Sequence, residues 1–229
     1  MHKDLLVRSS GYFEKATTGI WTEAQTGVFR LVEEDVQVFE LFVQWLYSGR
    51  IEALDTDDLQ EFLVEAWSCG QRLQAREFQN AVINMLFQDW AEYRSSVYPN
   101  NYAIAARAYA TTMPRSTLRT LIIDKFSAHA HSNMLDSVTE ELPSDLLADM
   151  TQRLLTNVAE LIETGSEAED SRSRLEYDIC ERYHEHKEGS VPCTGAEIRA
   201  SYRLFEPPST KFENLAPFEQ SMAAEIVEN

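Results

Sequence analysis

The segment between residues 38 and 47 constrains the fold most, because it is apolar on two faces at helical spacing. A helix that is apolar around most of its circumference is stable only when other elements surround it. The first stripe is formed by Val38, Leu41, Phe42 and Trp45, and the second by Phe39, Val43 and Leu46. Gly49 follows and suits the left-handed conformation that often ends a helix. The sequence therefore predicts a deeply buried helix, and 44% hydrophobic residues can supply the core around it.

Helical spacing recurs in the rest of the first 95 residues. Residues 5–16 are predicted to form one helix that Gly19 ends. An acidic run at 55–58 favours the start of another helix. Side-chain oxygens can accept hydrogen bonds from the free N–H groups of the first turn, and the helix dipole favours negative charge there. Gly70 is expected to interrupt that helix, and a new apolar stripe restarts at Phe78.

Two short segments have the character of strands. Residues 28–31 form a short β-type run after Gly27, and a second short strand is predicted near Ile51. Together with the helical stripes, these strands predict an α+β fold that is mostly helical.

Beyond Pro99 the chain keeps a helical pattern. Ser116 is placed to cap a helix over 118–126, and Pro143 sits at the first turn of a further helix. The polar, aperiodic segment 166–174 is the best candidate for a linker. Because residues 190–229 combine several prolines with scattered aromatics, we expect them to be poorly ordered unless a ligand or partner holds them.

The predicted organisation therefore has three parts. Residues 1–95 form a first domain, 96–163 a helical extension, and 164–229 a linker and acidic tail.

The charge balance bears on the possible partners. The chain has 38 acidic and 20 basic residues, a net charge of -18. Such a chain lacks the basic surface that phosphate neutralisation requires, so we expect no nucleic-acid or membrane partner. Three cysteines do not indicate a disulfide framework. No apolar run approaches the length of a membrane span. We expect an intracellular protein, cytoplasmic or nuclear.

A series of short runs between residues 2 and 90 keeps a consistent spacing. The runs are His2-Lys3-Asp4-Leu5-Leu6, Ser9-Ser10-Gly11-Tyr12-Phe13, Val28-Phe29-Arg30-Leu31 with Asp35, Val38-Phe39, Trp45-Leu46-Tyr47-Ser48-Gly49, Gln71-Arg72-Leu73-Gln74 and Phe78-Gln79-Asn80-Ala81-Val82. This series resembles the BTB/POZ domain, in the style of filamentous-fungal proteins. The resemblance implies a truncated BTB/POZ fold followed by a helical extension and a poorly ordered acidic tail.

The same resemblance implies a function without catalysis. Domains of this family act as self-association scaffolds or as adaptors that recruit a cullin-type ubiquitin ligase. The family's domain normally begins upstream of His2, with a hairpin that is missing here. We therefore expect homodimerisation to be impaired. The alternative is that the sequence is a fragment or carries a wrongly chosen start site.

Trp21 and Glu23 lie between the first helix and the strand at 28–31. They resemble the apolar–any–Glu signature with which cullin-recruiting BTB proteins use this loop. An aromatic anchor with an orienting carboxylate suits such an interface. The alternative is that Trp21 folds back onto the domain as local packing.

Cys180, His184, His186 and Cys193 form the second candidate site. Two thiols and two imidazoles within a short segment are the donors of a closed tetrahedral zinc site, which would define a zinc-binding regulatory protein. Against zinc, the spacing is not that of a standard finger, and two histidines two residues apart point to opposite sides of a strand. The alternative is a solvated tail with incidental Cys and His residues and no cofactor.

Catalytic motifs are not found in the sequence. It contains no phosphate-binding glycine loop, no dinucleotide fingerprint and no Gly-x-Ser-x-Gly elbow. We therefore expect the protein not to be an enzyme.

Overall fold

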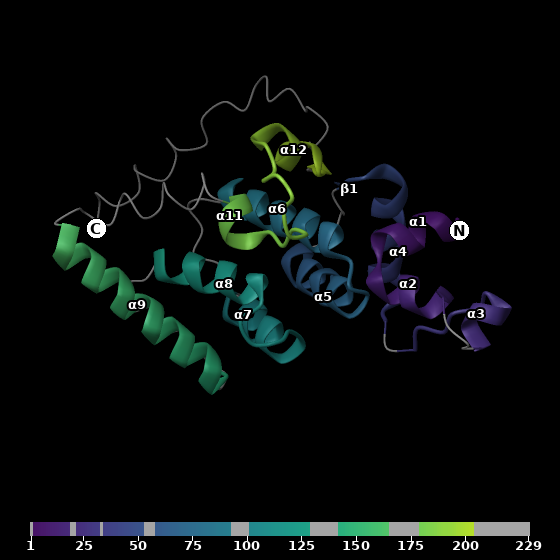
Figure 1. The fold of residues 1–229 in the computed structure, drawn as a ribbon. Coiled ribbons are helices and arrows are strands. Elements are labelled where there is room, and N and C mark those ends of the chain that lie inside the picture. The colour runs from purple at the N-terminus through teal and green to yellow at the C-terminus, as the bar shows by residue number, and fades with distance from the viewer. Residues whose placement is uncertain are drawn as a thin grey trace, which may run out of the picture.

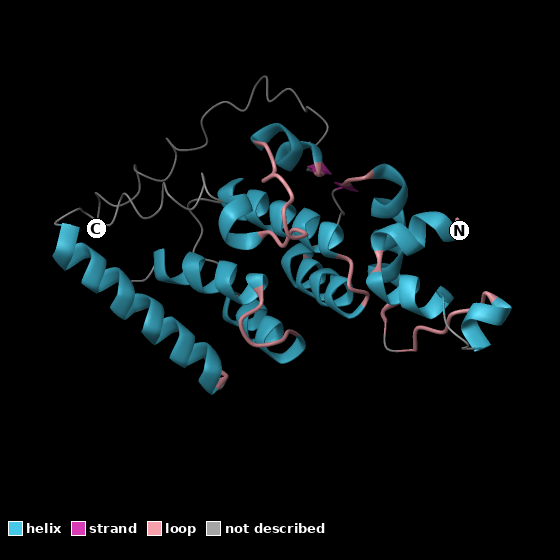
Figure 2. Cartoon of the chain, in the orientation of Figure 1, coloured by secondary structure: helices cyan, strands magenta, loops and turns pink. Residues whose placement is uncertain are grey.

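The computed structural model is mostly helical (Figures 1 and 2). It describes residues 2–18, 22–32, 34–52, 58–92, 101–128, 142–164 and 179–203. Within these residues, no helix is both long and apolar enough to cross a membrane.

The elements of the first half are α1 (Lys3–Ser9), α2 (Gly11–Thr18), α3 (Thr22–Thr26), α4 (Val36–Ser48), β1 (Ile51–Glu52), α5 (Leu59–Arg72) and α6 (Arg76–Glu92). Those of the second half are α7 (Asn101–Thr111), α8 (Thr117–Ala128), α9 (Ser144–Thr164), α11 (Ile179–Tyr183), α12 (Gly195–Ala200) and β2 (Tyr202–Arg203).

Helix α6 lies at the centre of the molecule, with α5 beside it (Figure 1). Its residues 81–87 are all buried, and α1, α4, α11 and α12 also contact it. Helices α1–α3 lie at one end of the molecule and α9 at the other (Figure 1). A single hydrophobic cluster extends from Leu6 in α1 to Tyr183 in α11.

The predicted buried helix is confirmed as α4. The Asp35 carboxylate accepts hydrogen bonds from the N–H groups of Gln37 and Val38 and so caps its first turn. Gly49 ends the helix in the left-handed conformation, with φ of 72°, and its N–H donates to the Trp45 carbonyl. The side chains of both predicted stripes are buried or half-buried.

The single helix predicted over residues 5–16 is wrong, because Ser10 divides it into α1 and α2. Ser10 has an extended backbone, with φ of -142° and ψ of 118°. Its hydroxyl donates to the Leu73 carbonyl at 2.6 Å and accepts the N–H of Phe13 at 3.2 Å. A contact distant in sequence, at the end of α5, therefore interrupts a helix that local spacing favours. Gly19 lies outside the described residues.

The strand predicted at residues 28–31 is also wrong, since this segment has no regular secondary structure. A strand is stable only when a neighbouring strand satisfies its backbone groups, and no described strand lies beside this one. Phe29 instead packs its ring against Phe13, with centroids 5.3 Å apart, while Val28 is exposed.

Gly70 does not interrupt α5, which continues to Arg72. A Cβ atom at Gly70 would lie 2.7 Å from Cγ of Gln79 and 3.1 Å from Cδ1 of Phe78. The glycine therefore permits α5 and α6 to approach closely, a packing requirement rather than a break.

The predicted boundaries beyond Pro99 agree with the structure. Ser116 caps α8, because its hydroxyl accepts the N–H of Arg119 at 3.3 Å. Pro143, predicted in the first turn of the next helix, lies one residue before the start of α9. The proposed linker at 166–174 and the last residues, 204–229, lie outside the described part of the chain.

The expectation of poor order fails for residues 190–203, which pack with α11 on α6. Here β2 pairs in parallel with β1, Ile51 opposite Tyr202, so the strand predicted near Ile51 is confirmed. The sequence did not reveal this arrangement because the anchoring groups lie about a hundred residues upstream, in α6.

Candidate metal centre

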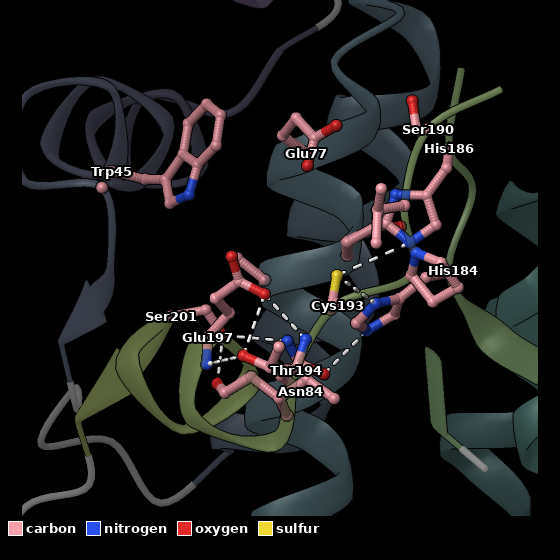
Figure 3. Close-up of a pocket in the computed structure, with 16 residues that line it drawn as sticks. Trp45, Glu77, Asn84, His184, His186, Ser190, Cys193, Thr194, Glu197 and Ser201 are labelled. Carbon is pink, nitrogen blue, oxygen red and sulfur yellow. Dashed lines mark hydrogen bonds between the residues drawn. The ribbon is translucent and has the colours of Figure 1, made fainter. Parts of the chain in front are cut away.

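Four donor side chains meet where the C-terminal segment crosses α6. One nitrogen or sulfur atom from each of Cys180, His184, His186 and Cys193 lies within 4.8 Å of those of the other three. Cys180 Sγ lies 3.2 Å from His186 Nε2, and Cys193 Sγ lies 3.6 Å from His184 Nδ1 and 3.5 Å from His186 Nε2. Figure 3 shows both imidazoles turned toward Cys193.

Three of the six distances among the four donors agree with a tetrahedral metal site. Zinc–sulfur bonds of about 2.3 Å and zinc–nitrogen bonds of about 2.05 Å place sulfur and nitrogen about 3.6 Å apart in a tetrahedron. The three sulfur–nitrogen distances lie close to this value. The donor set, two thiols and two imidazoles, is also one that zinc favours and that magnesium and calcium do not.

Helix α11 carries Cys180 and is tied to α8 through one buried carboxylate. Asp124 accepts hydrogen bonds from Arg182 at 2.6 Å and from the Tyr183 hydroxyl at 2.9 Å. Arg153 of α9 also pairs with it, at 2.5 Å. The ion pairs offset the cost of burying the charge, so this end of the site is fixed by the body of the protein.

Asn80 of α6 holds the backbone between the two histidines. Its amide nitrogen donates to the Glu185 carbonyl at 2.9 Å, and its amide oxygen accepts the Glu185 N–H at 2.9 Å. This two-point contact fixes the peptide that separates His184 from His186. The segment is a loop rather than a strand, so the expectation that the two rings point to opposite sides is wrong.

The hydrogen bonds around His184 determine which of its nitrogens is free for a metal. The Ser201 hydroxyl donates its hydrogen to the Ile198 carbonyl, at 2.7 Å, so it acts as an acceptor toward the Asn84 amide nitrogen at 2.9 Å. The Asn84 oxygen then faces His184 Nε2, at 2.8 Å, and accepts a hydrogen bond from its N–H. His184 Nδ1 therefore carries a lone pair and faces Cys193.

This arrangement is typical of a metal ligand, because a ligating histidine usually donates its other N–H to a fixed acceptor. His184 would bind through Nδ1 and His186 through Nε2. The use of different ring nitrogens explains how histidines two residues apart can serve one ion.

The pKa values of two candidate ligands give the protonation states that a metal ion would meet. Burial, with a contribution from His186, lowers the pKa of His184 to about 4, so its ring is neutral at pH 7. Burial and the hydrogen bond with Cys180 raise the pKa of Cys193 to about 11. A metal ion that binds here must release the thiol protons, which makes binding dependent on pH.

An open pocket of about 550 Å³ adjoins the cluster. It lies between α6, the end of α4 and the loop that carries Cys193, and Figure 3 shows Trp45 and Glu77 on its far side. At its floor, the Thr194 hydroxyl accepts the Glu197 N–H while the Glu197 carboxylate accepts the Thr194 N–H. This reciprocal cap begins α12 directly after Cys193 and fixes the direction of the chain there.

The other predicted site is only partly described. Glu23 lies in α3 with its side chain exposed, whereas Trp21 lies outside the described residues. The structure therefore places the Glu23 carboxylate at the surface, and the pairing with Trp21 stays a prediction.

Sequence reasoning missed the residues that support the cluster, namely Asn80, Asn84 and Ser201. Asn80 and Asn84 lie four residues apart, on one face of α6, and both are buried. Two amides in the otherwise apolar stretch 80–87 were the available signal, since a buried amide needs hydrogen-bond partners.

Comparison with known proteins gives no assignment: no family model matches the chain, and no curated protein matches it.

Proposed function

We propose that Cys180, His184, His186 and Cys193 bind one zinc ion, and that the protein is a zinc-stabilised module for protein interactions. The observation that supports this proposal is the convergence of two sulfurs and two imidazole nitrogens within 4.8 Å, with His184 oriented by Asn84. Four protein ligands fill a tetrahedral shell, which is the pattern of a structural rather than a catalytic zinc site.

The role of the ion follows from the position of the four donors, which lie on two parts of segment 179–203 that pack on α6. Segment 179–203 reaches the core mainly through Ile179 and Tyr183, so apolar burial alone holds it weakly. A zinc ion would cross-link α11 to the loop before α12 and so stabilise the whole segment on α6. Binding energy at such sites contributes directly to folding.

Metal analysis of protein purified without chelator tests the proposal. We expect one zinc ion per chain, lost in Cys180→Ser and in Cys193→Ser. Cys69→Ser is the matched control, because Cys69 is buried in α5 beside Glu34 and, within the described part of the chain, lies in no group of metal donors. A metal content near zero, with Cys180 and Cys193 freely reactive toward a thiol reagent, would rule out the site.

A second candidate function is that of a BTB/POZ-type adaptor for a cullin-type ubiquitin ligase or a self-association scaffold. The exposed Glu23 favours it. Three valines between α3 and the first residue of α4 are also exposed, namely Val28, Val32 and Val36 at 59%, 89% and 71%.

Binding to a cullin N-terminal domain tests this second candidate. We expect a pull-down signal that Trp21→Ala and Glu23→Lys each reduce, since one removes the anchor and the other reverses the charge. Glu14→Lys, on the neighbouring helix α2, is the matched control for charge. Equal recovery of the wild type and all three variants would exclude this loop as the docking point.

A further inference from the structure

A chain of hydrogen bonds connects the metal cluster to the β1–β2 pair. His184 Nε2 donates to Asn84 Oδ1 at 2.8 Å, and Asn84 Nδ2 donates to Ser201 Oγ at 2.9 Å. The Ser201 carbonyl accepts the N–H of Ile51 in β1, at 2.9 Å. Figure 3 shows Asn84 between His184 and Ser201. One buried amide thus joins a candidate metal ligand to the residue that begins the strand pairing.

The strand pair at the end of this chain is weak by itself. Each strand has two residues, and an isolated two-stranded ladder is marginally stable even when longer. Its persistence therefore depends on the contacts that hold the two strands against α4, α6 and α12, and the Ser201 side chain supplies one of them. The described side-chain contacts of Ser201 are with Asn84 and, within α12, with Ile198.

We propose that metal occupancy of the cluster controls the pairing of β2 with β1, and that Asn84 is the positioning residue that couples them. This inference rests on the proposed zinc site. An ion bound to Nδ1 fixes the His184 ring and keeps its proton on Nε2. That proton holds the Asn84 oxygen, which in turn directs the Asn84 amide nitrogen at Ser201.

Loss of the ion removes the contact that fixes the His184 end of this hydrogen-bond chain. The His184 ring becomes free to rotate or to exchange its proton between the two nitrogens, and the Asn84 amide, which then bonds only to Ser201, loses its second fixed contact. Ser201 then loses its fixed partner, and β2 separates from β1. The edge of β1 at Ile51, covered in the paired state, becomes available to an extended segment of a partner protein, since exposed strand edges pair readily.

Amide hydrogen exchange, measured by NMR with zinc and after chelation, tests the coupling. We expect zinc to slow exchange of the Ile51 N–H by about tenfold or more relative to that of Leu121 in α8, which reports global opening. Ser201→Ala keeps all four ligands and the Asn84–His184 bond but removes the acceptor. It should bind one zinc ion and lose the zinc dependence at Ile51.

Two further variants complete the test. Ser201→Thr retains a hydroxyl and should restore the zinc dependence. Ser190→Ala, which alters the same pocket away from the hydrogen-bond chain, should leave it unchanged. If zinc binds but Ile51 exchanges equally with and without it, the coupling is wrong while the zinc site stands. If no zinc binds, both proposals fail.

Discussion

Single buried polar residues determine much of the local stability, and Arg119 is the clearest case. This side chain of α8 is 5% exposed, and its guanidinium donates to the backbone carbonyls of Tyr109 and Thr112 at 2.7 and 2.6 Å. It also pairs with Asp145 at the start of α9, at 2.8 Å. Arg119 therefore provides hydrogen-bond donors for two free carbonyl groups at the carboxyl end of α7 and connects α7, α8 and α9.

Replacement of Arg119 by methionine should lower the free energy of unfolding by about 2–4 kcal/mol, because two buried carbonyls lose their donor. Arg107→Met is the matched control. Arg107 pairs with Glu65 at the surface, where an ion pair contributes less than about 1 kcal/mol. Denaturant unfolding measures both values, and equal losses would contradict the special role of Arg119.

The pKa of His184 predicts how the metal-free protein responds to acid. Because burial depresses this pKa from 6.5 to about 4, the folded state binds a proton less readily than the unfolded state. The stability that the neutral ring contributes is complete above about pH 6.5 and is lost as the pH falls toward 4. Unfolding in the presence of chelator should show about 1–2 kcal/mol less stability at pH 5 than at pH 7.

His184→Gln removes the titrating group and should flatten this pH dependence. If the variant and the wild type lose the same stability between pH 7 and pH 5, the acid sensitivity arises elsewhere.

At the scale of elements, the close approach of α5 and α6 depends on Gly70. Gly70→Ala should destabilise the fold by about 1–2 kcal/mol, because overpacking against Gln79 and Phe78 outweighs the better helix propensity of alanine. Adding Gln79→Ala removes the nearer atom and should recover part of the loss. A double-mutant cycle by thermal or denaturant unfolding measures this coupling, and strict additivity would contradict the predicted clash.

Elements whose limits are set locally could be predicted from the sequence. The limits of α4 follow from its two apolar stripes and Gly49, and the start of α8 follows from Ser116. The predicted limits of a helix were wrong where a contact distant in sequence determines where the helix ends. Ser10 divides a helix because it bonds to Leu73, and Gly70 remains helical because Gln79 packs above it.

In the candidate site, too, the local features could be predicted from the sequence and the features set by distant contacts could not. Composition and proximity in the sequence identified all four donors, whereas their convergence depends on Asn80 and Asn84, which are about a hundred residues distant in the chain. The spacing rule for a strand argued against His184 and His186 as joint ligands. It failed because Asn80 holds the intervening peptide in a loop conformation.

At the scale of the whole molecule, α5 connects the first part of the chain to the helices beyond residue 100. Three residues on one face of α5 bond to α7 or to the turn that follows it. Glu65 pairs with Arg107, the Ser68 hydroxyl bonds to that of Thr111 at 2.9 Å, and the Gln71 side chain accepts the N–H of Met113 at 3.3 Å. The described core also continues from α5 through α6 to α8 without interruption.

This continuity predicts that residues 1–95 are less stable alone than within residues 1–164. Removal of α7 exposes the contact face of α5, and the apolar surface that leaves the core lowers stability by about 25 cal/mol per Å². We expect chain 1–95 to unfold at a lower denaturant concentration and to bind a dye specific for apolar surface. Chain 1–128, which keeps α7 and α8 but lacks α9, should lie between the two. If 1–95 and 1–164 share one midpoint and neither binds the dye, the α5–α7 contact contributes nothing to folding, and the first 95 residues are an independent unit.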